Sequence, residues 1–575
     1  MFLNEIIILF TFLVITKCGT DEVDEMTSET YSIRINFTNR FNDTHPISSV
    51  TFYPKQVYNI LGVTTVSEFL GIPFARPPID YFRLKRPHPH YGNDTHLKFY
   101  ANVSSGSCVQ KTLNTGIPKF DYYNSKDHMS EDCLKLNIWK PGVNSDAVIV
   151  FFHGGDLLRG SASAELYRGH YFAAYARAII VSANYRLGPY GFAYLGKKTK
   201  IPGNMGLLDQ TMALRWVNEH IHAFGGNPRK ITIFGHEAGG AAAATHLFSG
   251  ASKGLFKRII LSSGVFPNHR FTVSHKQLIE RTRRLSDDMY CKNQTNTLVE
   301  LCLAQREDNT LRMVISKLRE QENKPLRKMF GISSKDKEYF VRDFRKLKMK
   351  KDVDILVGTT EDEGTLFYFD YVRDNYKHLE KHNETKEAFM QLVTDINNKL
   401  FDKVAKDYNI NKEVFKKARA AMKKIVGDRE YLVGQRLFHE MHFECDWAKF
   451  LERALKKNVK SVYAYRFMHR PKNYDWPEWL PFVITGSDIE FVFGSPFKNY
   501  KIHDEKLFTL ELIVAMKMMK MFGRFANTGV PDERWVPFSR ENKKILILNL
   551  NLAKRNAYIF EEFKRNDRCK LFKNY

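Results

Sequence analysis

The sequence predicts an α/β fold with a large, mostly parallel central sheet and helices on both faces. Short, apolar, β-rich segments alternate with helical segments, which is typical of strands buried on both sides. The order strand, helix, strand favours parallel connections between neighbours. The expected strands cover Ala147 to His153, Ala178 to Ala183, Lys230 to Phe234, Arg258 to Leu261, Val353 to Gly358 and Val459 to Phe467.

One crossover helix is visible between the second and third of these strands. Leu207, Leu214, Val217, Ile221 and Phe224 follow one another at steps that place them on one helical face, and two glycines end the run. Such an amphipathic helix covers one face of a sheet.

Composition limits the class of protein. The chain has 575 residues, 88 Lys and Arg against 64 Asp and Glu, a net charge of +24 and 43% hydrophobic residues. Its mean hydropathy is −0.39. These values describe a soluble globular protein and exclude disordered, collagenous and multi-span membrane classes. No repeat or long linker divides the chain, so we expect residues 31–575 to form a single domain.

The N-terminus predicts a signal peptide over residues 1–18. Ile6 to Ile15 is an apolar run of the length of a secretory core, with small residues near Cys18, and an acidic, flexible leader over residues 19–30 follows. A short buried N-terminal segment is the alternative, because Glu5 and no basic residue precede the run. Ten apolar residues are too few to span a bilayer, and no later stretch is long enough. We therefore expect a secreted protein without a membrane span.

Cysteines and glycosylation motifs agree with secretion. Removal of Cys18 leaves an even number of cysteines, which favours three disulfides in an extracellular protein. N-glycosylation acceptor motifs occur at Asn36, Asn42, Asn93, Asn102, Asn293 and Asn383.

The chemistry is expected directly after the strand that ends at Phe234. There the sequence reads Gly235-His236-Glu237-Ala238-Gly239-Gly240 and enters an Ala-rich helix. A strand, a turn of small residues and a helix are typical of a nucleophile elbow. We take Ala238 as its central residue, and a methyl group cannot attack a carbonyl.

This segment resembles the elbow of the type-B carboxylesterase and cholinesterase family, within the α/β-hydrolases. The similarity extends from about Val50 to the C-terminus. Further segments that resemble the family are Phe69-Leu70-Gly71-Ile72-Pro73-Phe74-Ala75, Ser130-Glu131-Asp132-Cys133-Leu134, Asn184-Tyr185-Arg186-Leu187-Gly188, Gly203-Asn204-Met205-Gly206-Leu207-Leu208-Asp209-Gln210 and Glu490-Phe491-Val492-Phe493-Gly494.

The resemblance implies an α/β-hydrolase fold and a Ser, His and Glu triad, of which two members are missing. The Ser position is assigned to Ala238, the His position falls on Thr485, and only the acid, Glu363, is kept. A Thr hydroxyl cannot act as a general base near neutral pH. The oxyanion donors implied by the resemblance are the N–H groups of Gly155, Asp156 and Gly239, and a carboxylate at Asp156 would oppose the developing negative charge.

Structural interpretations of the nearby polar residues compete with catalytic ones. Glu363 without its His is expected to serve as a hydrogen-bonding residue at a turn. His153 and His236 are expected to be scaffold residues, since no nucleophile accompanies them. Ser262 and Ser263 are expected to be turn residues.

The resemblance also implies the disulfides Cys108–Cys133 and Cys291–Cys302. Cys569 matches the family's C-terminal cysteine, but the position near Val433 where its partner is expected is not Cys. Cys445 is the one remaining cysteine, and we therefore assign it to Cys569.

Ligand and partner predictions are less specific. Tyr123 replaces the Trp that stacks on quaternary ammonium in cholinesterases, and the net charge of +24 argues against choline-like ligands.

Basic segments at 342–351 and 412–424 are solvated helical faces, or they contact acidic extracellular partners such as sulfated glycans, anionic membrane surfaces or acidic proteins. Nucleic acid is disfavoured, because no groove-reading or stacking motif is present. No metal or cofactor is expected.

Two functions are consistent with these observations. The favoured one is a secreted, noncatalytic cholinesterase-like protein that binds a protein partner or a ligand, as neuroligin-like relatives do. The alternative is an ester hydrolase with residual or altered activity, or a stoichiometric sink for hydrophobic esters.

The methionines at 516, 518, 519 and 521 lie on an expected helix from about Lys506 to Asn527, and they belong to the core or to a homodimer interface.

Overall fold

The computed structural model of the chain describes residues 32–37, 48–60, 62, 64–90, 96–110, 128–196, 199–268, 270–292, 295–307, 330–336, 338–366, 368, 401–406, 411–427, 430–471, 483–498, 505–554, 557–564 and 567–570. The expected signal peptide and leader, Tyr123 and four of the glycosylation motifs (Asn42, Asn93, Asn293 and Asn383) lie outside these residues. Asn36 lies in strand β1, and Asn102 is exposed just after strand β5.

An 11-stranded sheet forms the centre, in the order β18-β17-β16-β15-β12-β11-β9-β10-β8-β4-β3. All neighbouring pairs from β17 to β10 are parallel, whereas β18, β8, β4 and β3 join antiparallel. The predicted α/β class is therefore confirmed. The strands are β3 (Gln56–Ile60), β4 (Thr64–Pro73), β8 (Lys135–Pro141), β9 (Val148–Phe152), β10 (Ile179–Ala183), β11 (Ile231–His236), β12 (Arg258–Ser262), β15 (Asp354–Thr360), β16 (Ser461–Phe467), β17 (Lys544–Leu548) and β18 (Ile559–Glu562).

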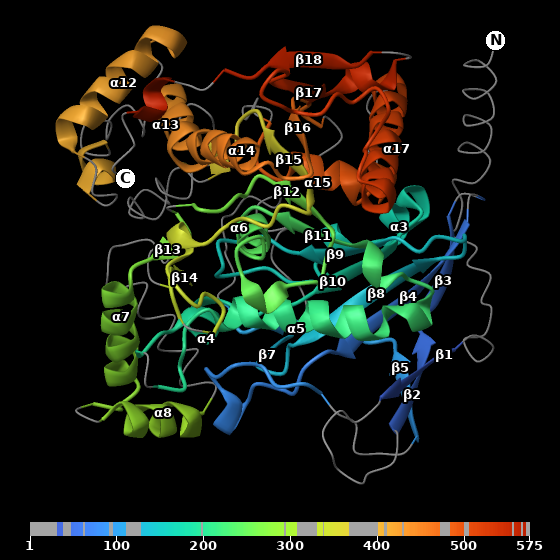
Figure 1. Cartoon of the computed structure of the whole chain (residues 1–575), viewed down its shortest axis with the longest axis vertical. Helices are drawn as coiled ribbons and strands as arrows, with labels where there is room; N and C mark the ends of the chain where they lie inside the picture. Colours follow the sequence, from blue (N-terminus) through green and yellow to red (C-terminus); the bar gives the residue numbers. More distant parts are fainter. Residues whose placement is uncertain are drawn as a thin grey trace.

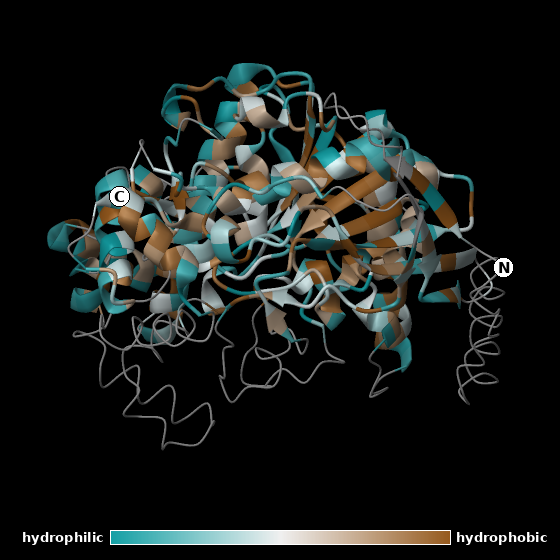
Figure 2. Cartoon of the chain, turned by 90° about the horizontal axis from the view of Figure 1, so that it is seen from below, coloured by the Kyte–Doolittle hydropathy of each residue, from teal (hydrophilic) through white to brown (hydrophobic). Residues whose placement is uncertain are grey.

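Helices cover both faces of this sheet. Successive side chains of a strand point to opposite sides, and here both sides carry apolar side chains that must be buried. In β9, Val148 and Val150 join one hydrophobic core, and Ile149 and Phe151 join the other. Helices α5 (Met205–His220) and α6 (Ala238–Thr245) contribute to the first core; α3 (His170–Ala176), α15 (Ser487–Val492) and α17 (Glu505–Thr528) contribute to the second (Figure 1). Figure 2 shows that the central strands are largely hydrophobic, while hydrophilic residues concentrate towards the outside.

Two predicted helices are confirmed. Helix α5 continues into a 3₁₀ turn, Ile221–Phe224, and Gly225 ends it with a φ of 85°. The long helix α17 buries Met518, Met519 and Met521. These methionines are core residues.

Smaller elements surround the central sheet. A three-stranded sheet contains β1 (Ile33–Phe37), β2 (Ser48–Pro54) and β5 (His96–Ala101), and two-stranded pairs join β6 (Ser107–Cys108) to β7 (Met129–Ser130) and β13 (Thr272–Val273) to β14 (Ile332–Ser333). The other helices are α4 (Gly188–Phe192), α7 (His275–Asp288), α8 (Asn296–Gln305), α12 (Lys412–Val426), α13 (Glu430–His439), α14 (Cys445–Lys457) and α16 (Ser495–Lys498). A π-helical turn, Glu440–Glu444, connects α13 to α14.

Three disulfides link the chain, and all three predicted pairs are confirmed. They are Cys108–Cys133, Cys291–Cys302 and Cys445–Cys569. The last connects helix α14 to the C-terminal segment and closes the longest of the three loops. In the chain-entropy model, this disulfide therefore removes the most conformational entropy from the unfolded chain. In the part of the chain that the structure describes, no helix is long and apolar enough to cross a bilayer.

Candidate functional site

The elbow between β11 and α6 consists of a single residue, Glu237. Its backbone has φ 51° and ψ −115°, a strained conformation for a residue with a side chain. Small neighbours permit the tight turn: a Cβ on Gly235 would lie 2.4 Å from the carbonyl oxygen of Gly239, and one on Gly264 would lie 1.8 Å from that of Glu237. The turn therefore projects the Glu237 side chain from the carboxyl end of the sheet.

The prediction that Ala238 is the central residue is wrong by one position. Ala238 is the first residue of α6 and is fully buried. The flanking glycines of the motif, Gly235 and Gly239, enclose three residues, and the middle one is Glu237. A carboxylate, and not a methyl group, therefore occupies the position from which a nucleophile would attack.

The third oxyanion donor is also one residue away from its predicted position. In an elbow of this type the donor belongs to the residue after the nucleophile, which is Ala238 and not the predicted Gly239. Gly239 has a different reason to be glycine, because a Cβ there would lie 2.2 Å from the carbonyl oxygen of His153. It allows α6 to pack closely against the end of β9.

The two other predicted oxyanion donors do converge on one point, but Glu237 already occupies it. Carboxylate oxygen Oε2 of Glu237 accepts hydrogen bonds from the N–H groups of Gly155 (2.8 Å) and Asp156 (3.0 Å). Both donors lie in a loop after β9 whose residues have positive φ angles, 109° for Gly155 and 61° for Asp156. The chain's own carboxylate therefore occupies the place of a developing oxyanion.

Arg270 connects this carboxylate to a second one. Its Nη2 lies 3.0 Å from Oε1 of Glu237 and also forms an ion pair with Oδ1 of Asp156. All three side chains are buried, with exposed fractions of 3% for Arg270, 5% for Glu237 and 6% for Asp156. We refer to Glu237, Asp156 and Arg270 as the buried ionic triad. Sequence reasoning missed Arg270, which lies in the loop after β12, and it misplaced Glu237.

The acid position agrees with its predicted role as a hydrogen-bonding residue at a turn. Glu363 is fully buried and accepts hydrogen bonds from the Thr359 hydroxyl (3.0 Å) and the Thr360 N–H (2.7 Å). Burial raises the pKa of Glu363, and the hydroxyls of Ser263 and Thr485 counteract this effect. Thr485 is buried and carries no group that could accept a proton from a nucleophile at neutral pH.

The remaining polar residues near the elbow do not supply a substitute base. Burial lowers the pKa of His153 to about 4 and that of His236 to about 3, so both rings accept a proton less readily than an ordinary His side chain. A ring nitrogen of His153 is 2.8 Å from the carbonyl oxygen of Gly154, and the ring stacks on Tyr185. The Ser262 hydroxyl donates to Asp488 at 2.6 Å, which engages it in a structural contact.

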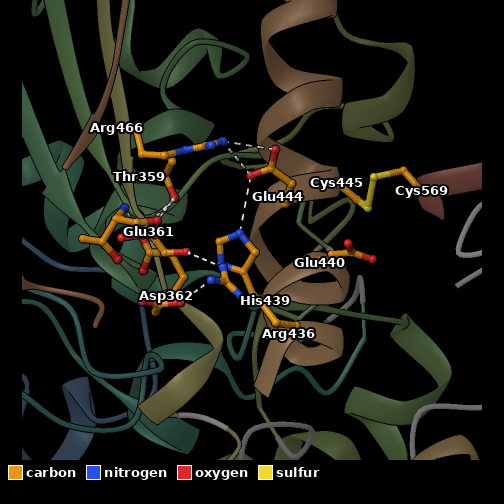
Figure 3. Close-up of polar contacts among 12 residues, drawn as sticks. Thr359, Glu361, Asp362, Arg436, His439, Glu440, Glu444, Cys445, Arg466 and Cys569 are labelled. Atoms are coloured by element: carbon orange, nitrogen blue, oxygen red, sulfur yellow. Dashed lines mark hydrogen bonds and ion pairs between the residues drawn. A yellow bond between two sulfur atoms is a disulfide. The ribbon is translucent and has the colours of Figure 1, made fainter. Parts of the chain in front are cut away.

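A second charged cluster anchors the loop that carries Glu363 (Figure 3). We call Asp362, Arg436, His439, Glu444 and Arg466 the acid-loop clamp. Arg436 of α13 pairs with Asp362 at 3.2 Å, and Glu444 of the π-helical turn pairs with His439 at 3.5 Å and with Arg466 of β16 at 3.3 Å. Helix α13 and the π-helical turn are thus attached to the ends of β15 and β16.

The acid-loop clamp is expected to stabilise the folded state to an extent that depends on pH. Burial raises the pKa of Glu444, but the hydrogen bond from His439 and the charge of Arg466 more than offset this and lower it. A carboxylate with a lowered pKa stabilises the folded state above its ordinary pKa, and the effect is lost as the pH falls through the folded value. We expect Glu444→Gln to lower the free energy of unfolding by about 1.5–3 kcal/mol at pH 7.

Urea unfolding at a series of pH values tests this. The difference between the parent and Glu444→Gln should shrink as the pH falls below about 4.3, the ordinary pKa of a Glu side chain. Glu533→Gln is the matched control, because Glu533 pairs with Arg524 on the surface and is 80% exposed. A Glu444→Gln difference that is the same at pH 7 and at acidic pH would contradict the assigned role.

Comparisons with known proteins cover almost all of the described chain. A model of the Carboxylesterase family matches residues 56–569. The acetylcholinesterase of Electrophorus electricus is 33% identical over 547 residues, which are 87% of this chain and 83% of the relative. The acetylcholinesterase of Danio rerio is 32% identical over 550 residues, with the same coverage of both proteins. That of Bungarus fasciatus is 33% identical over 491 residues, 81% of this chain and 76% of the relative.

Proposed function

Because this chain belongs to the carboxylesterase family, the family of the serine carboxylesterases, we propose that it is a noncatalytic, cholinesterase-like member that acts by binding a protein partner or a ligand. One observation carries the proposal. The apex of the elbow holds Glu237, and its carboxylate accepts the hydrogen bonds of Gly155 and Asp156 that an oxyanion would need.

Three chemical arguments support the loss of ester hydrolysis. A carboxylate is a weaker nucleophile than a Ser hydroxyl paired with a base, and its attack on an ester would give a reactive anhydride. Glu237 also places negative charge where charge should develop in the transition state, which opposes the reaction. No base stands at Thr485 to move protons.

The alternative, an ester hydrolase or a stoichiometric ester sink, requires another free nucleophile. Ser262 ends the neighbouring strand β12, level with His236, and its hydroxyl donates to Asp488, whose pKa burial raises. Tyr465 donates to the same carboxylate at 2.7 Å. The Ser262 hydroxyl therefore has a structural role, which favours a binding function over ester hydrolysis.

An extracellular location belongs to the same proposal. Disulfides persist in oxidising compartments, and three are present. The glycosylation motif at Asn102 is exposed, as an acceptor must be. The expected signal peptide would direct the chain there.

Steady-state hydrolysis by the intact glycoprotein tests the loss of activity. We expect acetylthiocholine and p-nitrophenyl acetate to be hydrolysed no faster than by an equal concentration of a protein without an esterase site. Catalytic turnover at rates typical of enzymes, roughly 1–10³ per second, would contradict the proposal. Cross-linking of the intact protein in extracellular fluid, followed by mass spectrometry, is the complementary search for its partner.

A further inference from the structure

The parallel topology gathers lysines from separate parts of the sequence at one edge of the sheet. Strands β17, β16, β15, β12 and β11 are neighbours and run parallel, so their first residues share the edge opposite Glu237. In register, Thr232 pairs with Arg258, Arg258 with Asp354, and Asp354 with Ser461, so β11, β12, β15 and β16 begin at one level. In β17, Leu546 pairs with Tyr465, so this strand begins two residues further along than β16. A lysine lies at the start of each strand or up to three residues before it: Lys230, Lys257, Lys351, Lys460, Lys543 and Lys544. We call these six the strand-start lysines.

Most of the strand-start lysines extend into solvent. The side chains of Lys257 and Lys460 are 56% and 59% exposed, that of Lys230 is 34% exposed, and Lys351, Lys543 and Lys544 are exposed residues. Adjacent strands are about 4.8 Å apart, so five strands spread these charges over roughly 20 Å. The charge forms a row along the edge.

Nearby carboxylates neutralise only part of this row. The pairs are Asp146 with Lys230 (2.8 Å), Asp352 with Lys257 (3.8 Å) and Asp354 with Lys460 (2.9 Å). Glu562 lies opposite Lys544 in register but forms its ion pair with Lys564. Within the described residues, Lys351, Lys543 and Lys544 form no ion pair, so the row keeps a positive charge.

The row continues onto a neighbouring basic segment. Lys346 and Lys348 are exposed, and the carbonyl oxygen of Leu347 between them accepts a hydrogen bond from Arg453 of α14. The segment is thereby held beside the end of α14, where Lys456 is also exposed. Large aromatic side chains that could stack on bases are not among the exposed hydrophobic residues of these described segments.

We propose that the strand-start lysines bind a sulfated polysaccharide. A linear polyanion carries many charges at short intervals and can contact a row of ammonium groups together, releasing bound counterions. The choice of a glycan rests on the extracellular location in the proposed function, whereas the choice of an anionic chain rests on the row itself. Aromatic stacking, which single-stranded nucleic acid would need, is not offered by these described segments.

Heparin affinity of the intact glycoprotein tests the proposal. We expect the parent to be retained on immobilised heparin above 0.15 M salt, about physiological ionic strength. The variant Lys351→Ala/Lys543→Ala/Lys544→Ala should bind soluble heparin on the order of tenfold more weakly and with a smaller dependence on salt. These three side chains are exposed, so the fold should be kept, and an unchanged circular dichroism spectrum would verify this.

The matched control is Lys416→Ala/Lys417→Ala/Lys424→Ala, which removes the same charge from helix α12. It should bind within about twofold of the parent. Equal losses in both variants, or no retention of the parent, would overturn the proposal, as would stronger competition by duplex DNA or by phosphatidylserine vesicles than by heparin. Esterase assays on the same samples keep the two proposals separate, because the strand-start lysines lie at the edge of the sheet opposite Glu237.

Discussion

The double variant Glu237→Ser/Thr485→His is expected to hydrolyse p-nitrophenyl acetate, while each single variant stays close to the parent. Ser at position 237 places a hydroxyl at the apex of the elbow and releases the N–H groups of Gly155 and Asp156 from the Glu237 carboxylate. His at position 485 supplies a base. The Glu363 carboxylate interacts with the side chain at position 485 and can therefore orient this base. A general base contributes about 10²–10⁴-fold, and members of a triad act as a unit.

The register of the elbow gives this experiment a sharp control. Ala238→Ser/Thr485→His adds the same two functional groups, but the hydroxyl then stands on the first turn of α6 with Glu237 still at the apex. We expect this variant to show no activity above the parent. Activity in the Ala238→Ser pair alone would contradict the corrected assignment.

Arg270→Met is expected to destabilise the folded protein more than Glu444→Gln does. Arg270 is the cation between two buried carboxylates, and breaking a buried ion pair on one side costs about 3–5 kcal/mol. Methionine keeps much of the side-chain volume, so the loss reports charge and not a cavity. Urea unfolding at pH 7 and the yield of secreted protein both measure it.

A compensated variant separates the charge effect from a packing effect. Arg270→Met/Asp156→Asn/Glu237→Gln removes all three charges, and we expect it to recover most of the lost free energy of unfolding. Arg345→Met is the matched surface control, because the Arg345 side chain pairs with Asp343 and is 73% exposed. It should change the free energy of unfolding by less than about 1 kcal/mol. A triple variant no more stable than Arg270→Met would contradict the charge explanation.

Much of the fold follows from local sequence pattern. The expected strand from Val459 to Phe467 and the helix with period 3.6 at 207–224 correspond to β16 and to α5 with its 3₁₀ turn. Burial on both faces gives such strands continuous apolar runs, and these are visible without a partner. The antiparallel strands β3 and β4 were not among the expected strands; β3 has no continuous buried apolar run to reveal it.

The site was harder to predict, for two physical reasons. Arg270 contacts Glu237 through a fold that brings the loop after β12 beside the elbow, and no local pattern encodes such a contact. The apex was misplaced by one residue because, without a Ser, only the spacing of Gly235 and Gly239 marks its position. The pKa of Glu363 responds to the Thr485 hydroxyl, so these two predicted positions do lie together.

The row of strand-start lysines could not be predicted from the sequence either, for a third physical reason. Lys257 and Lys460 lie far apart in sequence, and each is an ordinary surface lysine when considered alone. Only the parallel order of β12, β15 and β16 places them along one edge. The basic segments that the sequence did reveal, at 342–351 and 412–424, account for part of the surface charge.

Covalent labelling by a fluorophosphonate tests the central claim most directly, because capture requires a competent nucleophile at the elbow. Intact-mass measurement after incubation of the parent should show no adduct, whereas Glu237→Ser/Thr485→His should gain one phosphonate per chain, on the serine introduced at position 237. A stoichiometric adduct on the parent, mapped to the segment 235–240 or to Ser262 or Ser263, would contradict a noncatalytic site.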